Sequence, residues 1–189
     1  MDQETFHILG IAGSLRSGSY NRGLLRAASE LLPPGVSLEI LTLEEIPLFS
    51  ADVMAEGDPP AVQTLKERIK VADAVLIATP EYNYSIPGVL KNAVDWASRP
   101  SKNSVLRGKP IGIMGASGGD SGTIRSQMAL RQVFIQTHSF VMVQPELRVA
   151  QAGTKFDTAG NLVDAELRER LRAFVAALID WARLVGSRD

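Results

Sequence analysis

Short apolar runs alternate along the chain with longer segments in which apolar residues recur at helical spacing. The runs at 7–12, 73–79 and 110–116 are mostly apolar, which is typical of strands buried in a parallel sheet. Alternating apolar positions predict a strand at 36–41, and the run at 139–143 predicts a fifth strand. Helical spacing predicts helices over residues 21–32, 59–71, 88–97, 123–136 and 164–185.

Because strands and helices alternate, the pattern predicts a three-layer α/β sandwich whose parallel, five-stranded sheet has helices on both faces. The expected strand order is 2-1-3-4-5, with the switch point between the first and third strands. Segment 44–58 shows little periodicity and is expected to be a long surface loop, and 154–161 is expected to be a turn or hairpin. No internal repeat or linker divides the chain, so residues 1–189 are expected to form one domain.

The composition excludes several classes of function. The 189 residues carry a net charge of −1, which gives no reason to expect a nucleic-acid or anionic-membrane partner. The chain has no cysteine, and its histidines, His7 and His138, are too few to suggest a metal site. No apolar run approaches the ~20 residues needed to cross a bilayer, and the acidic start lacks a secretory pattern. We therefore expect a cytoplasmic protein that is not inserted in a membrane.

The loop after the first strand is suited to bind an anion. Residues 13–21 carry small polar side chains and one guanidinium, at Ser14, Arg16, Ser17, Ser19 and Asn21. Backbone N–H groups and the helix dipole favour negative charge at the helix start, and Arg16 adds a charge-assisted donor for phosphate oxygens. The glycines do not match G-x-G-x-x-G, and Ser19 stands where a triphosphate-binding loop needs lysine, so a terminal monophosphate is the expected guest. The alternative is a capped helix preceded by polar loop residues.

The loop after the third strand, residues 79–88, is suited to hold a planar ring. Pro80 and Pro87 stiffen it, and Glu81 and Asn83 alternate with Tyr82 and Tyr84. Backbone amides and an amide side chain can read the polar edge of a heterocycle while a ring or flat backbone covers its face. The alternative is a turn whose tyrosines cap the core. On the helix that follows, an i, i+4 pair of Lys91 and Asp95 is expected on the surface, and Trp96 in the core or an interface.

The loop after the fourth strand contains G-x-S-x-G at residues 115–119, the pattern of the α/β-hydrolase nucleophile elbow around Ser117. A hydrolase would need an acid and then a histidine farther along the chain. The only later histidine is His138, and the chain between the two leaves too little room for the usual strands and the acid. The glycines are better explained by a close approach of backbone to a flat ligand.

Together, GSLRSGSYN and PEYNYSIPGVLKNAVDW resemble the flavodoxin-like NAD(P)H-dependent FMN reductases, which include chromate/quinone reductases and azoreductases. The resemblance spans about residues 7–145 and implies a flavodoxin-like fold that binds FMN. It implies contacts to the FMN phosphate from Ser14, Arg16, Ser19 and Asn21, with Leu15 and Tyr20 as backbone or packing contacts. It implies contacts to the isoalloxazine ring from Pro80, Glu81, Tyr82, Asn83, Tyr84, Ser117 and Gly118.

The resemblance also implies an activity. NAD(P)H would reduce the flavin, and a quinone, flavin, azo or oxidised-metal acceptor would then take the electrons, with no catalytic side chain and no metal. The alternative is a flavodoxin-type electron carrier without NAD(P)H turnover, which the near-neutral charge and Arg16 disfavour. A homodimer or homotetramer is implied, and Trp96, Arg99 and segment 46–54 are expected where a partner would cover the flavin. The alternative is an ordinary surface loop and a core tryptophan. No 2′-phosphate fingerprint separates NADH from NADPH.

Overall fold

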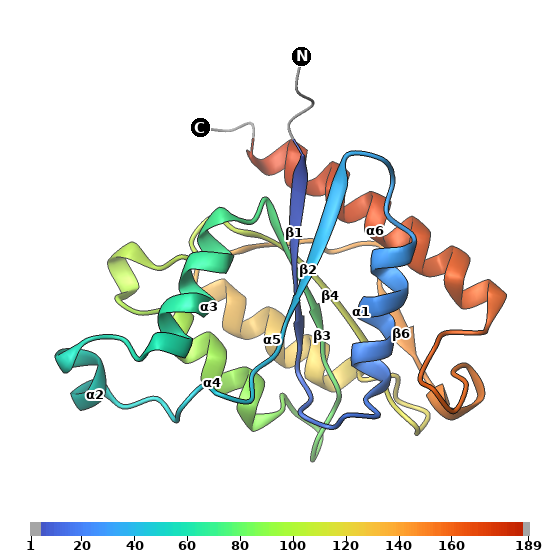
Figure 1. Cartoon of the computed structure of the whole chain (residues 1–189), viewed down its shortest axis with the longest axis horizontal. Helices are drawn as coiled ribbons and strands as arrows, with labels where there is room; N and C mark the ends of the chain where they lie inside the picture. Colours follow the sequence, from blue (N-terminus) through green and yellow to red (C-terminus); the bar gives the residue numbers. More distant parts are fainter. Residues whose placement is uncertain (1–4, 187–189) are drawn as a thin grey trace.

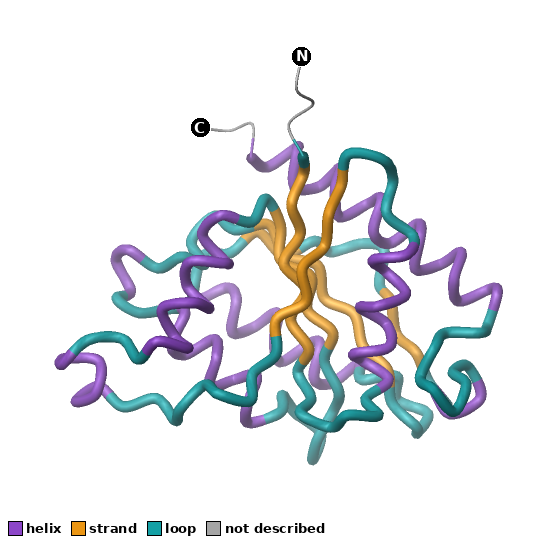
Figure 2. The backbone as a smooth tube through the Cα atoms, in the orientation of Figure 1, coloured by secondary structure: helices purple, strands orange, loops and turns teal. Residues whose placement is uncertain are grey.

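The computed structural model describes residues 5–186, and its centre is one parallel sheet (Figures 1 and 2). Within these residues the sheet order is β2-β1-β3-β4-β5, with β6 also pairing β4. Every strand pair is parallel. This confirms the predicted order 2-1-3-4-5. The strands are β1 (Phe6–Ala12), β2 (Val36–Leu41), β3 (Ala74–Ala78), β4 (Pro110–Ala116), β5 (Phe140–Val141) and β6 (Leu147–Val149).

Helices cover both faces of the sheet, as the alternation of strands and helices predicts. The helices are α1 (Tyr20–Glu30), α2 (Ala51–Glu56), α3 (Pro60–Val71), α4 (Gly88–Ala97), α5 (Ile124–Gln136) and α6 (Ala165–Gly186), with short 3-10 turns η1 (Ser101–Asn103) and η2 (Ala152–Thr154). Helices α1 and α6 pack on one face, and α3, α4 and α5 pack on the other.

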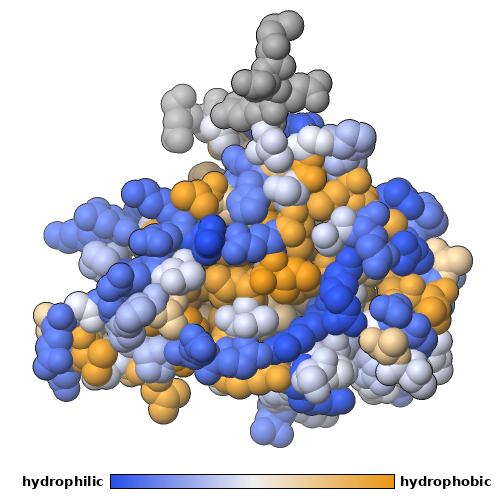
Figure 3. Space-filling view, in the orientation of Figure 1, coloured by the Kyte–Doolittle hydropathy of each residue, from blue (hydrophilic) through white to orange (hydrophobic). Residues whose placement is uncertain are grey.

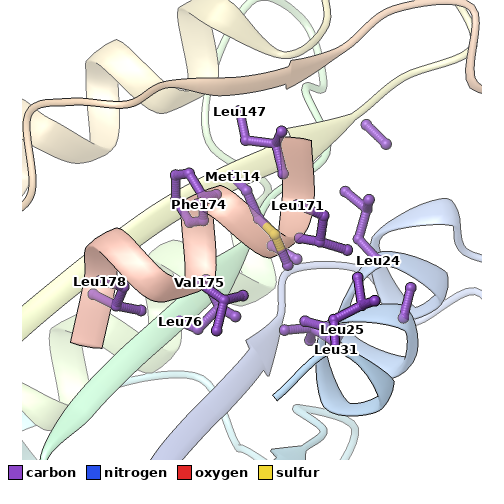
Figure 4. Packing of buried hydrophobic residues seen from close by; sticks show 14 of the residues in the cluster. Leu24, Leu25, Leu31, Leu76, Met114, Leu147, Leu171, Phe174, Val175 and Leu178 are labelled. Atoms are coloured by element: carbon purple, nitrogen blue, oxygen red, sulfur yellow. The ribbon is translucent and has the colours of Figure 1, made fainter. Parts of the chain in front are cut away.

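The core has two parts because side chains alternate between the faces of a strand. Ile8 and Leu76 pack with α1 and α6, whereas Leu9 and Val75 pack with the helices of the other face. Figure 4 shows the first part, where side chains of α1 and α6 meet those of β3, β4 and β6. Apolar surface reaches the outside at the centre of Figure 3, where the half-exposed edge strand β2 runs, with hydrophilic side chains to either side. Within residues 5–186, no helix has both the length and the apolar character needed to span a bilayer.

The fifth strand is shorter than the predicted 139–143. Met142 N–H still donates to the Ile111 carbonyl at 2.8 Å, and the chain then leaves β4, passes Pro145, and returns at Leu147 to pair with the second half of β4. Proline has no N–H for a ladder, so the chain between β5 and β6 does not continue the sheet. Not every apolar residue of the predicted helix at 123–136 faces the core: Met128 is 58% exposed, while Leu130 is buried.

The segment 44–58 is not a plain loop, because it contains α2. Ser50 caps this helix by accepting from the N–H groups of Asp52 and Val53, and Gly57, at φ 121°, ends it. No residue of α2 is buried, so the helix leaves no apolar periodicity in the sequence. The predicted turn within 154–161 is confirmed by a single bridge between Phe156 and Leu162.

Candidate functional site

The three polar loops begin at the same edge of the sheet, below the strands in Figure 1. Ladder hydrogen bonds continue one residue past each strand, from Gly13 N–H to the Ala78 carbonyl (2.9 Å) and from Thr79 N–H to the Met114 carbonyl (2.9 Å). The third loop is fixed in the same way, through Ser117 N–H, to the last residue of β6. The three loops therefore lie together at the carboxyl edge of the parallel sheet, which is where α/β sheets bind ligands.

A cavity of about 350 Å³ opens between these loops. Its walls include all of the residues for which the family resemblance implies FMN contacts except Leu15, Asn83 and Tyr84. Ser17 of the first loop does not line it either. Sequence reasoning missed one wall residue, Ala116, the last residue of β4. The lining residues are Ser14, Arg16, Ser19, Tyr20, Asn21, Pro80, Glu81, Tyr82, Ala116, Ser117 and Gly118.

The first loop presents the start of α1 to this cavity. Ser19 caps the helix and accepts from Asn21 N–H at 3.2 Å, so the capped-helix alternative describes this serine correctly. Ser14 is buried, with its hydroxyl 3.4 Å from the Tyr82 hydroxyl, and Arg16 is exposed at the cavity wall. Helix dipole, hydroxyls and guanidinium together make this end attractive to an anion.

Asn21 ties the first loop to the third. Its side-chain amide donates to the Ala116 carbonyl and accepts from the Ala116 N–H, both at 2.9 Å, and the side chain is buried. This pair of bonds joins the start of α1 to the end of β4. Asn21 therefore shapes the cavity wall, whether or not it also touches a ligand.

The second loop contains a tight hairpin at its tip. Tyr82 and Ser85 exchange backbone hydrogen bonds of 3.2 and 2.9 Å, and the two residues between them have positive φ, 49° at Asn83 and 67° at Tyr84. Two positive φ values define the type I′ turn of a two-residue hairpin. Tyr82 and Tyr84 are 46% and 73% exposed, so the alternative in which these tyrosines cap the core is wrong.

Glu81 turns its carboxylate toward the start of α5. It accepts from Arg125 Nε at 2.6 Å and from the backbone N–H of Arg125 at 2.9 Å, and its side chain is 6% exposed. Burial raises the pKa of Glu81, but the hydrogen bonds from Arg125 and from the Ser126 N–H outweigh it and lower the pKa below its usual value. Glu81 is therefore charged at neutral pH, with most of its bonding capacity used inside the protein.

Comparison with known proteins identifies the family. Residues 6–154 match the family described as NADPH-dependent FMN reductase. The chain belongs to this family. An NAD(P)H-dependent FMN reductase of Pseudomonas aeruginosa is 50% identical over 178 residues, covering 93% of this chain and 95% of the relative. A quinone reductase of Pseudomonas putida is 39% identical over 181 residues, covering 96% and 97%.

Solved structures of flavoenzymes share the fold of this FMN reductase family member. FerB, an NAD(P)H:acceptor oxidoreductase from Paracoccus denitrificans, has a TM-score of 0.85 and 33% identity, covering 94% of this chain and 97% of that one. A WrbA-like flavodoxin from Agrobacterium tumefaciens, at 16% identity and a TM-score of 0.60, shares the fold alone. The fold is therefore flavodoxin-like, as the sequence motifs imply.

The geometry disfavours the serine-hydrolase alternative for this family member. Ser117 follows the carboxyl end of β4, and its hydroxyl donates to the Gly119 carbonyl at 3.2 Å. The carbonyl of His138 accepts from Gly108 N–H, before β4 begins, and His7 lies near the start of β1. Both histidines are thus at the opposite end of the parallel sheet from Ser117, out of reach of its hydroxyl.

The cavity fits a flat cofactor that carries one phosphate. One end offers Arg16, serine hydroxyls and a helix start, and the other offers Tyr82 of the hairpin, the short side chain of Ser117 and the bare backbone of Gly118. A Cβ on Gly118 would meet nothing within 4 Å, so the third loop leaves open space there. Among residues 5–186, no group of three or more histidine or acidic side chains is arranged to hold a metal.

Proposed function

We propose that the protein is an NAD(P)H-dependent FMN oxidoreductase that reduces small-molecule acceptors, quinones foremost. The observation that carries the proposal is the cavity at the carboxyl edge of the sheet, because two of the three loops that form its walls bear the family's motifs. Quinone reduction is favoured because relatives with that name match along nearly the whole chain. Free flavins, azo compounds and oxidised metal anions are further candidate acceptors.

In this proposal, each loop binds a different part of the cofactor. Arg16, Ser14 and Ser19, with the start of α1, hold the phosphate through charge-assisted bonds and the helix dipole. Pro80 and the hairpin after it face the ring edge, and Ser117 and Gly118 allow a close approach to the ring. Leu15, Asn83 and Tyr84 would act through backbone groups or packing, since their side chains lie outside the cavity wall.

FMN held by these loops would supply the redox chemistry that links NAD(P)H to the acceptor. The chain's part is to bind, orient and stabilise charge, so we assign no catalytic acid, base or nucleophile. Backbone N–H groups of the hairpin that are not used in its own hydrogen bonds would stabilise negative charge on the polar edge of the ring. Glu81 does not serve as an acid in this scheme, because its lowered pKa keeps it ionised near neutral pH.

Steady-state kinetics test the proposal against the alternative of a flavodoxin-type electron carrier. Protein loaded with FMN is mixed with NADH or NADPH and a small quinone, and nicotinamide oxidation is followed by absorbance. The proposal predicts many turnovers per protein, with the quinone as the limiting reagent. A carrier would show binding of FMN without sustained consumption of either nicotinamide.

We also propose that the active form is a homodimer or homotetramer. Segment 46–54 supports this, since Leu48 is 85% exposed and Val53 is 42% exposed. Trp96 does not support it, because it is fully buried, with Nε1 donating to the Pro47 carbonyl at 2.8 Å and its ring edge-on to Phe49. Gel filtration at low protein concentration tests the proposal, and a monomer that retains full turnover would contradict it.

A further inference from the structure

We propose that Glu81 is a positioning residue that fastens the second loop to α5 by capping that helix from outside. The inference rests on the proposed function, in which the hairpin after Glu81 faces the flavin ring. It assigns the carboxylate to the shape of the site, whereas the family motif by itself suggests a contact with the cofactor.

The start of α5 lacks a cap of its own. Its N-cap residue, Thr123, has φ 65° and makes no capping bond, and its hydroxyl instead accepts from Gln127 Nε2 at 3.1 Å. The N–H groups that a capping side chain normally receives are those of the second and third helical residues, here Arg125 and Ser126. Glu81 Oε2 receives both, at 2.9 and 3.4 Å. Glu81, which belongs to the second loop, thus caps α5 in place of the helix's own N-cap residue.

Arg125 extends this link from Glu81 to the hairpin tip. Its guanidinium binds Glu81 Oε1 through Nε (2.6 Å) and Nη2 (2.5 Å), and its Cζ lies 3.6 Å from the centre of the Tyr84 ring. Tyr84 adopts the left-handed region, which is unfavourable for a residue with a large side chain and persists only when the surroundings hold it. Arg125, stacked on the tyrosine, supplies such a restraint.

A second link holds the base of the same loop. Thr79 Oγ1 donates to the Pro80 carbonyl at 2.8 Å, so the 2.9 Å bond between Thr79 and Ser126 has the Ser126 hydroxyl as its donor. Both side chains are fully buried. The first turn of α5 therefore contacts the second loop at Thr79, Glu81 and Tyr84. These three residues lie before, among and after the loop residues that line the cavity.

The same arrangement neutralises a charge beside the cavity. Glu81 contributes to the cavity wall, where an unpaired carboxylate would repel a phosphate or a negatively charged ring. The start of α5 and the Arg125 guanidinium both face this carboxylate and favour its charged form. Glu81 can therefore fasten the loop without adding a repulsive charge to the site.

The test combines two variants with a matched control. E81A removes the carboxylate, E81Q keeps its shape and one acceptor oxygen, and E169Q removes one partner of the exposed Glu169–Arg172 pair on α6. Backbone hydrogen exchange of residues 82–86 and 124–126 is measured on cofactor-free protein. FMN affinity is then measured by fluorescence quenching for the oxidised cofactor and, without oxygen, for the reduced one.

We expect E81A to speed exchange in both segments at least tenfold. It should also weaken FMN binding, and the affinity for reduced FMN should fall by a larger factor than the affinity for oxidised FMN. E81Q should recover part of both effects, and E169Q should match the wild type. Since E81Q retains the side-chain shape, the test does not depend on E81A folding. Unchanged exchange in both variants overturns the proposal, and weaker FMN binding with unchanged exchange shows that Glu81 contacts the cofactor directly. The exchange measurement needs no flavin, so a failure of the proposed function would appear separately, as wild-type protein that does not bind FMN.

Discussion

Replacing Asn21 by alanine tests whether the cavity wall depends on the bridge between the first and third loops. In the wild type, the amide of Asn21 both donates to and accepts from the backbone of Ala116 at 2.9 Å. Asn21 and Ala116 are each 2% exposed. The substitution therefore removes the hydrogen-bond partners of the buried N–H and the buried carbonyl of Ala116.

The size of the effect follows from those two groups. A buried backbone group without a partner costs about 1–3 kcal/mol, and water in the adjoining cavity moderates the loss, so we expect about 2–4 kcal/mol in total. For a chain of 189 residues, each kcal/mol lowers the melting temperature by about 2–4 °C. A loss of about 3 kcal/mol thus lowers it by roughly 6–12 °C.

Urea unfolding measures this loss as a change in midpoint at constant slope, since little surface changes. Asn92→Ala is the matched control, because Asn92 also bridges backbone groups, accepting from Phe49 N–H and donating to the Pro47 carbonyl, both at 2.8 Å. That bridge is partly exposed and lies outside the cavity wall, so we expect about 1 kcal/mol or less and unchanged FMN affinity. Equal small losses in the two variants would refute the idea that the Asn21 bridge holds the wall together.

Three further predictions concern the same loops. Arg16→Ala should weaken FMN binding by about 1–3 kcal/mol, since it removes a charge-assisted bond, and unchanged affinity in a fluorescence titration would remove Arg16 from the site. Gly115→Ala should destabilise the fold by about 3 kcal/mol, because its Cβ would overlap the Thr123 hydroxyl and the Thr79 carbonyl, whereas Gly118→Ala should leave the unfolding midpoint unchanged. The lowered pKa of Glu81 stabilises the fold fully above the unfolded value of 4.5, and this contribution is lost as pH falls through the folded pKa. Urea titrations across acidic pH should show a shallower decline for E81Q, and identical curves would contradict the assignment.

The sheet could be predicted because each buried strand leaves its own apolar pattern in the sequence. Strands β1, β3 and β4 are buried on both faces and read as continuous apolar runs, while loops that follow parallel strands must share one edge. Helix α2 could not be found by periodicity because none of its residues is buried, although Ser50 and Gly57 mark its ends. The division of the last strand into β5 and β6 depends on where the chain returns to β4, which no short pattern specifies.

The candidate site was predictable as a set of loops but not as a set of contacts. Most of the residues that line the cavity belong to the loops that the sequence singles out, because a helix start and polar side chains after a strand are visible in the sequence. The hairpin at Asn83 and Tyr84 lacks the glycine that usually signals a type I′ turn. The bonds from Glu81 to Arg125 and Ser126 join residues more than 40 positions apart, so only the folded chain brings them together.

The most direct test of the central claim is an absorbance spectrum of the purified protein, recorded without oxygen during titration with NADPH and then NADH. The proposed function predicts a yellow protein, or one that takes up added FMN stoichiometrically, whose flavin band bleaches with a nicotinamide and returns when a small quinone is added. Protein that leaves added FMN free in solution, or whose bound FMN stays oxidised with both nicotinamides, would contradict it.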